Sequence, residues 1–246
     1  MTYCLAIKTN TGIVFASDSR TNAGVDYIRT YSKMHVFSKE KDRVLVLLAS
    51  GNLATTQAVV NTIQNEIEDN AEVNLFNRRH LHDAAKYIGE ISRKEQLQHA
   101  AAFQDSSGGS TSATMILGGQ IAGRAPEIFL IYPEGNYISA SPETPYLQIG
   151  ETKYGKPILD RIVSPVTTLE DAARCAMVSL DSTMRANLSV GPPLELSIYR
   201  SDSLEMPTHR VFKLQSPFFK SLQKSWGEGL QRAFKRLPRF DWEDGK

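Results

Sequence analysis

Cysteine is scarce in this sequence, and long hydrophobic runs are missing. Cys4 and Cys175 are the two cysteines in 246 residues. They are too few for a disulfide scaffold, and we expect both to be small apolar core residues. No apolar stretch reaches the roughly 18 residues of a membrane span. The first residues also lack the basic and long apolar segments of a signal peptide. We therefore expect a cytoplasmic protein with no membrane partner.

An excess of charge of either sign is missing as well. The 28 lysines and arginines nearly balance the 27 aspartates and glutamates, which leaves a formal net charge of +1. Binding to nucleic acid through bulk positive charge is therefore disfavoured, and we expect no nucleic-acid partner. Because 41% of the residues are hydrophobic, the chain can bury a core and is not expected to be disordered.

Common motifs of metal, phosphate and serine chemistry are absent. The sequence has no His-Glu-x-x-His, Cys-x-x-Cys or Gly-x-Ser-x-Gly. Residues 150–156 fit the first part of a phosphate-binding loop, but Pro157 stands where that loop needs a serine or threonine for Mg²⁺. We therefore expect no metal site and no cofactor.

Hydrophobic periodicity divides most of the chain into strands and helices. Short apolar, β-branched runs predict strands, and longer segments with apolar residues three and four positions apart predict helices. Expected strands cover 3–8, 12–17, 43–50, 114–117, 127–132, 137–140, 146–149, 194–200 and 209–214; expected helices cover 54–67, 81–102 and about 170–187, with a loop over 104–112. The run at 43–50 is apolar throughout, which is typical of a strand covered on both faces. This order favours one α+β domain over residues 2–214, with helices layered on stacked antiparallel sheets.

The last 32 residues, 215–246, form a C-terminal extension of different character. Its apolar stripe comprises Phe218, Phe219, Leu222, Trp226, Leu230, Phe234 and Leu237. Seven basic residues against four acidic ones give it a local net charge of +3, which leaves −2 for the rest of the chain. We expect this amphipathic basic extension to pack on its own subunit or on a neighbouring one. A membrane surface or the groove of a partner protein are the alternatives.

Thr2 offers the most specific chemistry in the sequence. Removal of Met1 would place a hydroxyl and a free α-amine, with an ordinary pKa of about 7.7–8.0, on one residue. Asp18 ends the second expected strand, and Lys33 lies at a similar depth on the next one. A lysine near the hydroxyl favours loss of its proton, and Asp18 would keep that lysine charged and oriented. A structural ion pair or solvated surface charges are the alternatives for Asp18 and Lys33.

These residues and their surroundings resemble the N-terminal region of proteasome β subunits. The likeness continues through Gly24, through Lys33 before an apolar residue, and through Ala49-Ser50-Gly51 after an apolar strand. Four stretches are similar to the Anbu family of bacterial proteasome-related peptidases: SDSRTNAG (17–24), FLIYPEGN (129–136), IGETKYGKPILDR (149–161) and SLDSTMRANLSVG (179–191). The resemblance covers residues 2 to about 214.

The resemblance implies a four-layer αββα Ntn-hydrolase sandwich of two antiparallel sheets and self-assembly into a homo-oligomer, as a ring or spiral. It implies that Thr2 attacks a peptide or unfolded protein, that its own amine is the base, and that Lys33 and Asp18 tune it. Backbone N–H groups near Ser50 and Gly51 would form the oxyanion hole. Ser189 would hydrogen-bond the terminal amine.

Two positions depart from the proteasomal pattern. An aspartate is usual three residues before the serine that Ser189 matches, but this chain has Ala186 there, followed by Asn187. Asn187 could assist without supplying charge, and Glu151 replaces a second serine. These departures keep two other functions open: a catalytically weak oligomeric peptide-binding scaffold, and an Ntn amidohydrolase of a small amide. The sequence leaves the existence of an ATPase partner open.

Overall fold

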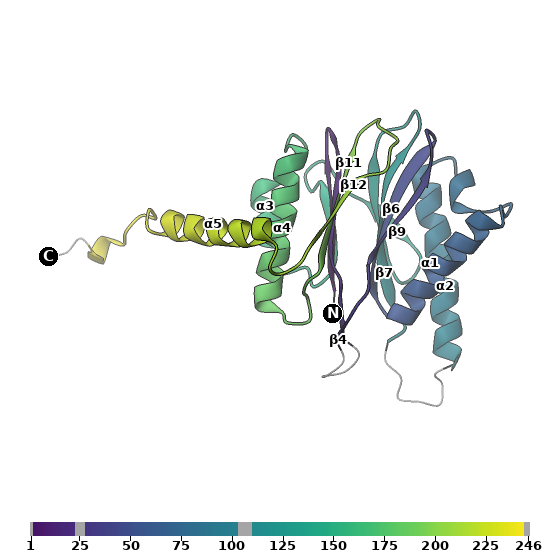
Figure 1. Ribbon diagram of the computed structural model, residues 1–246, viewed down its shortest axis with the longest axis horizontal. Coiled ribbons are helices and arrows are strands. Elements are labelled where there is room, and N and C mark those ends of the chain that lie inside the picture. The colour runs from purple at the N-terminus through teal and green to yellow at the C-terminus, as the bar shows by residue number, and fades with distance from the viewer. Residues whose placement is uncertain (1, 23–27, 103–109, 244–246) are drawn as a thin grey trace.

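Two five-stranded antiparallel sheets stack face to face and carry helices on both outer sides (Figure 1). The computed structural model describes residues 2–22, 28–102 and 110–243. The expected four-layer αββα sandwich is confirmed. Gly24 and positions 104–109 of the expected loop lie outside the described residues.

The first sheet has the order β10-β1-β2-β11-β12. Its strands are β1 (Tyr3–Thr9), β2 (Gly12–Asp18), β10 (Tyr146–Gly150), β11 (Leu194–Arg200) and β12 (Thr208–Phe212). The central hairpin of β1 and β2 is almost completely buried, because a sheet lies against one of its faces and helices lie against the other. Tyr3 pairs with Gly150, so the start of β1 lies beside the end of β10.

The second sheet has the order β5-β6-β7-β8-β9. Its strands are β5 (Met34–Lys39), β6 (Arg43–Gly51), β7 (Ala113–Ile121), β8 (Glu127–Ile131) and β9 (Tyr137–Ser139). In β6 every residue from Arg43 to Ser50 is buried, as the continuous apolar run predicted.

Helices α1 (Leu53–Glu68) and α2 (Leu81–Ala102) cover the second sheet, whereas α3 (Lys156–Ile162) and α4 (Leu169–Ala186) cover the first (Figure 1). The structure also has two single 3₁₀ turns, η1 (Leu75–Asn77) and η2 (Asp241–Glu243). Capping side chains define the starts of α1 and α4. Asn52 Oδ1 accepts a hydrogen bond from the backbone of Thr55, and the Thr168 hydroxyl does the same for Asp171.

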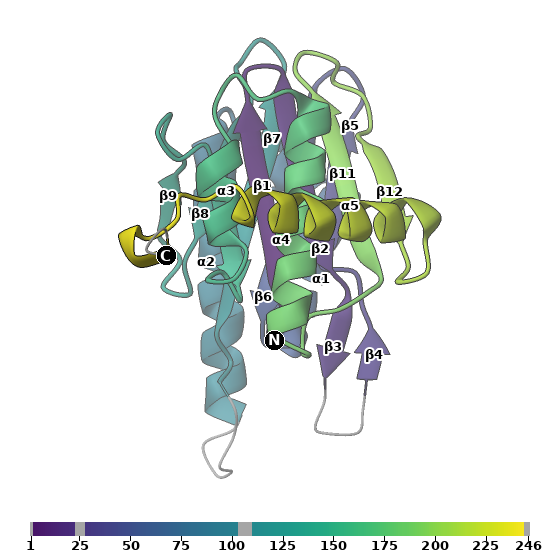
Figure 2. The ribbon, with the colours of Figure 1, turned by 90° about the vertical axis from the view of Figure 1, so that its left-hand side faces the viewer.

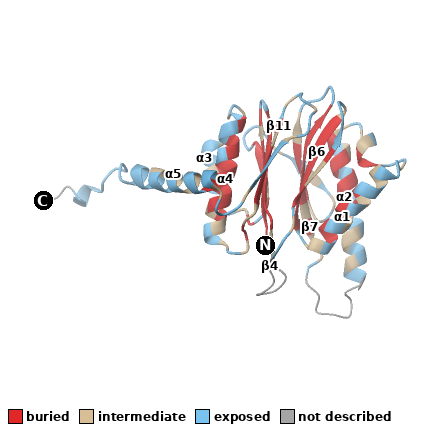
Figure 3. Cartoon of the chain, in the orientation of Figure 1, coloured by how far each residue is buried: buried red, intermediate tan, exposed pale blue. Residues whose placement is uncertain are grey.

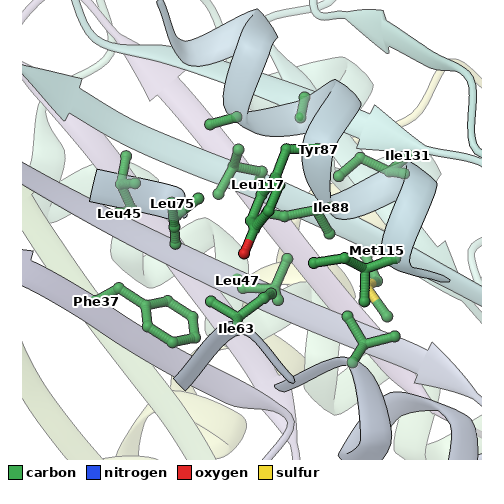
Figure 4. Packing of buried hydrophobic residues seen from close by; sticks show 14 of the residues in the cluster. Phe37, Leu45, Leu47, Ile63, Leu75, Tyr87, Ile88, Met115, Leu117 and Ile131 are labelled. Carbon is green, nitrogen blue, oxygen red and sulfur yellow. The ribbon is translucent and has the colours of Figure 1, made fainter. Parts of the chain in front are cut away.

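Burial is concentrated on the surfaces where the layers meet (Figure 3). One apolar cluster joins α1 and α2 to the second sheet, and Figure 4 shows members from both layers, such as Ile63 of α1 and Leu117 of β7. A second cluster lies between α4 and the first sheet, and a third lies between the two sheets around Phe15. Cys4 and Cys175 are both free and buried, as expected.

Helix α5 (Pro217–Phe234) projects from the sandwich after crossing the outer face of α4 (Figures 1 and 2). The start of α5 is firmly packed, because Phe219 is fully buried against α4 and the first sheet. Large apolar side chains are exposed near the end of α5, at Leu230 and Phe234, and in the segment after it, at Leu237, Phe240 and Trp242. The boundary between residues 214 and 215 as a domain limit stays a prediction.

The periodicity missed the strand β5, the helix α3, the turn η1 and a hairpin of β3 (Arg20–Asn22) and β4 (Ile28–Thr30). Lys33, which we expected on the strand after β2, instead directly precedes β5 in a segment without strand structure. Residues 110–112, the described part of the expected loop, form no helix or strand. In the part of the chain that the structure describes, no helix combines the length and apolarity needed to cross a membrane.

Candidate active site

Thr2 immediately precedes β1 and is 8% exposed. Its carbonyl oxygen accepts a 2.7 Å hydrogen bond from the backbone N–H of Glu151, which follows β10. Gly150, at φ +83°, approaches the same carbonyl so closely that a Cβ on it would lie 1.9 Å away. The edge strand β10 therefore fixes the main chain of Thr2 at one end of the first sheet.

Lys33 and Asp18 form a buried ion pair beside Thr2. Lys33 Nζ donates to Asp18 Oδ1 at 2.7 Å and to the carbonyl oxygen of Arg20 at 2.8 Å. Asp18 also accepts hydrogen bonds from the backbone N–H of Tyr3 at 3.0 Å and of Gly191 at 3.1 Å. The carboxylate is 0% exposed and the lysine side chain 8%. Three donors therefore surround the buried carboxyl group of Asp18, which in turn fixes the amino group of Lys33.

A cavity of about 460 Å³ brings the predicted residues together. Thr2, Lys33, Ser50 and Gly51 line it, and Asp18 stands behind Lys33. The other lining residues are Arg20, Thr21, Ala49, Asn52, Leu53, Thr56 and Gly150. The sequence reasoning did not assign them to the site. Arg20, Thr21, Ala49 and Gly150 nevertheless lie within motifs that it had singled out, and Asn52 directly follows one.

The end of β6 and the start of α1 form one wall of this cavity. Gly51 has φ +116°, and a Cβ there would lie 2.3 Å from the carbonyl oxygen of Ser112. Asn52 caps α1, and three residues at this helix start face the cavity. Unpaired N–H groups and the positive end of the helix dipole favour negative charge at such a position. The wall thus suits a developing oxyanion near Ser50 and Gly51.

Ser189 and Asn187 are not among the residues that line the cavity. The backbone N–H of Ser189 donates to Asn187 Oδ1 at 2.9 Å. Asn187 Nδ2 in turn donates to Glu151 Oε2 at 2.9 Å, and Glu151 is the residue whose backbone binds Thr2. Glu151, one of the two departures from the proteasomal pattern, is therefore in direct contact with Asn187, the neighbour of Ala186 at the other. The predicted bond from Ser189 to a terminal amine stays a prediction.

Neighbouring protic side chains are poor alternatives as nucleophile or base. Burial raises the pKa of the Tyr3 phenol and of the Cys4 thiol far above their ordinary values. Burial also lowers the pKa of His35. Tyr3 and Cys4 therefore remain protonated and unreactive at neutral pH.

A larger cavity of about 720 Å³ lies away from this chemistry, between α4 and α5. Apolar side chains such as Val178, Leu222 and Trp226 form much of its lining. Among the described residues, no group of three or more His, Cys, Asp or Glu side chains could hold a metal ion. We therefore assign the candidate active site to the smaller cavity.

A two-sheet sandwich with a threonine beside a buried Lys–Asp pair is the arrangement of proteasome-type Ntn hydrolases. The model of the proteasome subunit family matches residues 2–198. The chain belongs to this family. The proteasome subunit beta of Haloquadratum walsbyi is 26% identical over 214 residues, which cover 86% of this chain and 79% of that protein.

Solved structures place the likeness within a bacterial branch of the family. Anbu (ancestral beta-subunit) from Yersinia bercovieri is 44% identical, with a TM-score of 0.91 over 97% of this chain and 99% of that one. The helical assembly of the Anbu complex from Pseudomonas aeruginosa has 42% identity and a TM-score of 0.92 over 99% of this chain and 100% of that one. The chain is thus similar to Anbu proteins over nearly its whole length.

Proposed function

We propose that this chain, after removal of Met1, is an N-terminal threonine peptidase that works within a homo-oligomer. The observation that carries the proposal is the shared cavity of Thr2, Lys33, Ser50 and Gly51, with Lys33 held by Asp18. Membership of the proteasome subunit family supports it. We further propose a cytoplasmic location, which agrees with two free, buried cysteines.

In the proposed reaction, the Thr2 hydroxyl oxygen attacks the peptide carbonyl carbon and its proton passes to the α-amine of Thr2. The oxyanion that forms is stabilised by backbone N–H groups near Ser50 and Gly51. The C–N bond then breaks as the α-ammonium returns the proton to the leaving amine. Water hydrolyses the resulting ester and regenerates Thr2. The ammonium of Lys33 favours negative charge on the Thr2 oxygen throughout.

Self-assembly forms part of the proposal. Anbu from Pseudomonas aeruginosa was solved as a helical assembly, and the apolar side chains exposed on α5 suit contacts between subunits. Size-exclusion chromatography with light scattering tests this point. A monomer at micromolar concentration would contradict it.

The central experiment uses protein whose N-terminus has been verified by intact mass. We expect Thr2→Ala to abolish cleavage of a peptide library and modification by a threonine-directed electrophile, while the oligomer persists. Thr144→Ala is the matched control, because Thr144 is exposed in a turn before β10. Full hydrolysis by Thr2→Ala would overturn the assignment.

The contact between Glu151 and Asn187 supports a second candidate, a catalytically weak peptide-binding scaffold. Glu151 and Ala186 stand where the proteasomal pattern has a serine and an aspartate, and Glu151 binds Asn187 instead. Met1 retained in protein isolated from cells, together with peptide binding and no cleavage, would favour this scaffold. Cleavage of small amides but not of peptides would favour the amidohydrolase.

A further inference from the structure

A second buried carboxylate, that of Glu195, lies close to the candidate active site without lining its cavity. Glu195 belongs to β11, pairs with Ser17 of β2 and is 7% exposed. Side chains alternate along a strand, so Glu195 shares its face with Tyr199, which packs in the cluster between the two sheets. A carboxylate buried at this position needs partners for its charge.

Two serine hydroxyls supply those partners. Ser19 Oγ donates to Glu195 Oε1 at 2.9 Å, and Ser32 Oγ donates to Glu195 Oε2 at 3.0 Å. The Ser32 hydroxyl also lies 2.9 Å from the carbonyl oxygen of Met34, but the charged oxygen is the stronger acceptor for its one proton. His209 Nε2 lies 3.6 Å from Glu195 Oε2 and adds a charge partner when protonated.

Ser19 and Ser32 are adjacent in sequence to the two residues of the ion pair. Ser19 directly follows Asp18, and Ser32 directly precedes Lys33. The β3–β4 hairpin runs between them, and Tyr31 N–H donates to the Ser19 carbonyl at 3.0 Å across its base. The carboxylate of Glu195 therefore connects the two segments that flank the hairpin, next to the contact between Asp18 and Lys33.

We propose that Glu195 is a positioning residue: by holding Ser19 and Ser32 together, it keeps Lys33 in contact with Asp18 and aimed at Thr2. It acts through the two serines and touches no substrate. The expected effect of Glu195 on kcat rests on the proposed function. Its expected effect on the position of Lys33 does not depend on any reaction at Thr2.

The kinetic test compares Glu195→Ala with Glu195→Gln in mature protein. We expect Glu195→Ala to lower kcat by about tenfold or more, as for other residues that orient a functional side chain, and to leave KM within about twofold. Glu195→Gln should recover most of kcat, because its amide can still bind both hydroxyls. Glu170→Gln is the matched control, since Glu170 pairs with Arg200 on the exposed side of α4. It should leave kcat unchanged.

A second readout needs no catalysis. Lys33 is acetylated with an amine-reactive ester in a Thr2→Ala background, and the rate is followed by mass spectrometry of the Lys33 peptide. A lysine held in a buried ion pair reacts slowly, so Glu195→Ala should accelerate labelling of Lys33 severalfold. Lys86, exposed on α2, should be labelled at an unchanged rate.

The two readouts separate the two proposals. If wild type cleaves nothing and Glu195→Ala still accelerates Lys33 labelling, the proposed function fails and the positioning role stands. If wild type is active and Glu195→Ala keeps both kcat and slow labelling, the positioning role is overturned. If Glu195→Ala does not fold, Ser19→Ala and Ser32→Ala replace it. The same loss of kcat and faster labelling in these variants supports the role, and wild-type values in both overturn it.

Discussion

Replacement of Gly150 by alanine probes how tightly the position of Thr2 is set. A Cβ at residue 150 would lie 1.9 Å from the Thr2 carbonyl oxygen, whereas real Cβ contacts essentially never fall below 3.0 Å. The Thr2 main chain or the Gly150 backbone must therefore move by about 1 Å. A misplacement of that size in a catalytic group costs about 10²-fold in rate. We expect kcat of Gly150→Ala to fall by about that factor.

Part of the effect on stability comes from backbone strain alone. Alanine in the left-handed region lowers the free energy of unfolding by about 1–2 kcal/mol. In a domain of this size, each kcal/mol lowers Tm by about 2–4 °C. Gly123→Ala is the matched control, because Gly123 has φ +72° and a Cβ there would meet no atom within 4 Å. Both variants should lose stability, but only Gly150→Ala should lose turnover.

The assay measures kcat and KM on a peptide selected from the library, together with Tm, for protein with a verified N-terminal threonine. The expected pattern is a loss of kcat confined to Gly150→Ala. A folded Gly150→Ala variant with kcat within twofold of wild type would refute the assigned role of the Thr2 position. So would equal losses of kcat in the two variants, because strain rather than displacement would then explain them.

Two further predictions concern packing and burial. Phe219→Ala should lower the free energy of unfolding by about 3–5 kcal/mol, because this fully buried ring anchors α5; Phe218→Ala, at a position 51% exposed, should cost about 1 kcal/mol or less. Denaturant titration measures both, and equal costs would contradict the anchoring role of Phe219. Burial raises the pKa of Cys175 to about 12 and also raises that of Cys4. A raised pKa keeps a thiol protonated, so iodoacetamide at pH 8 should alkylate neither in the folded protein and both in urea, as read by mass. Rapid alkylation of either in the folded protein would count against this burial.

Most of the sandwich could be predicted because its strands and long helices carry strong periodic patterns. The strand β5 was missed because its residues, Met34–Lys39, alternate irregularly between buried and exposed positions. The helix α3 was missed because its 7 residues are too few to show a helical period. Pro157 stands in its first turn, where the missing N–H and fixed φ of proline are compatible with a helix.

Three residues of the candidate site could be chosen from the sequence, whereas the groups that hold them in place could not. Thr2, Asp18 and Lys33 could be chosen because an N-terminal nucleophile, a carboxylate and a lysine have recognisable roles and match a family pattern. The Gly191 N–H that binds Asp18 is 173 residues away in sequence, and a backbone donor carries no residue-type signal. Glu195 was likewise invisible, because a glutamate on a strand shows its partners only after β11 has paired with β2.

The bond between Asp18 and Gly191 has a consequence for the order of events during synthesis. Thr2 and Asp18 leave the ribosome early, whereas β10, which fixes Thr2, and Gly191, which completes the hydrogen bonds of Asp18, come much later. Under the proposed mechanism, a nascent or truncated chain would carry the threonine without the surroundings that activate it. Reactivity at Thr2 would arise only after the two ends of this long stretch have met. A growing polypeptide would then be protected from its own nucleophile until folding is complete.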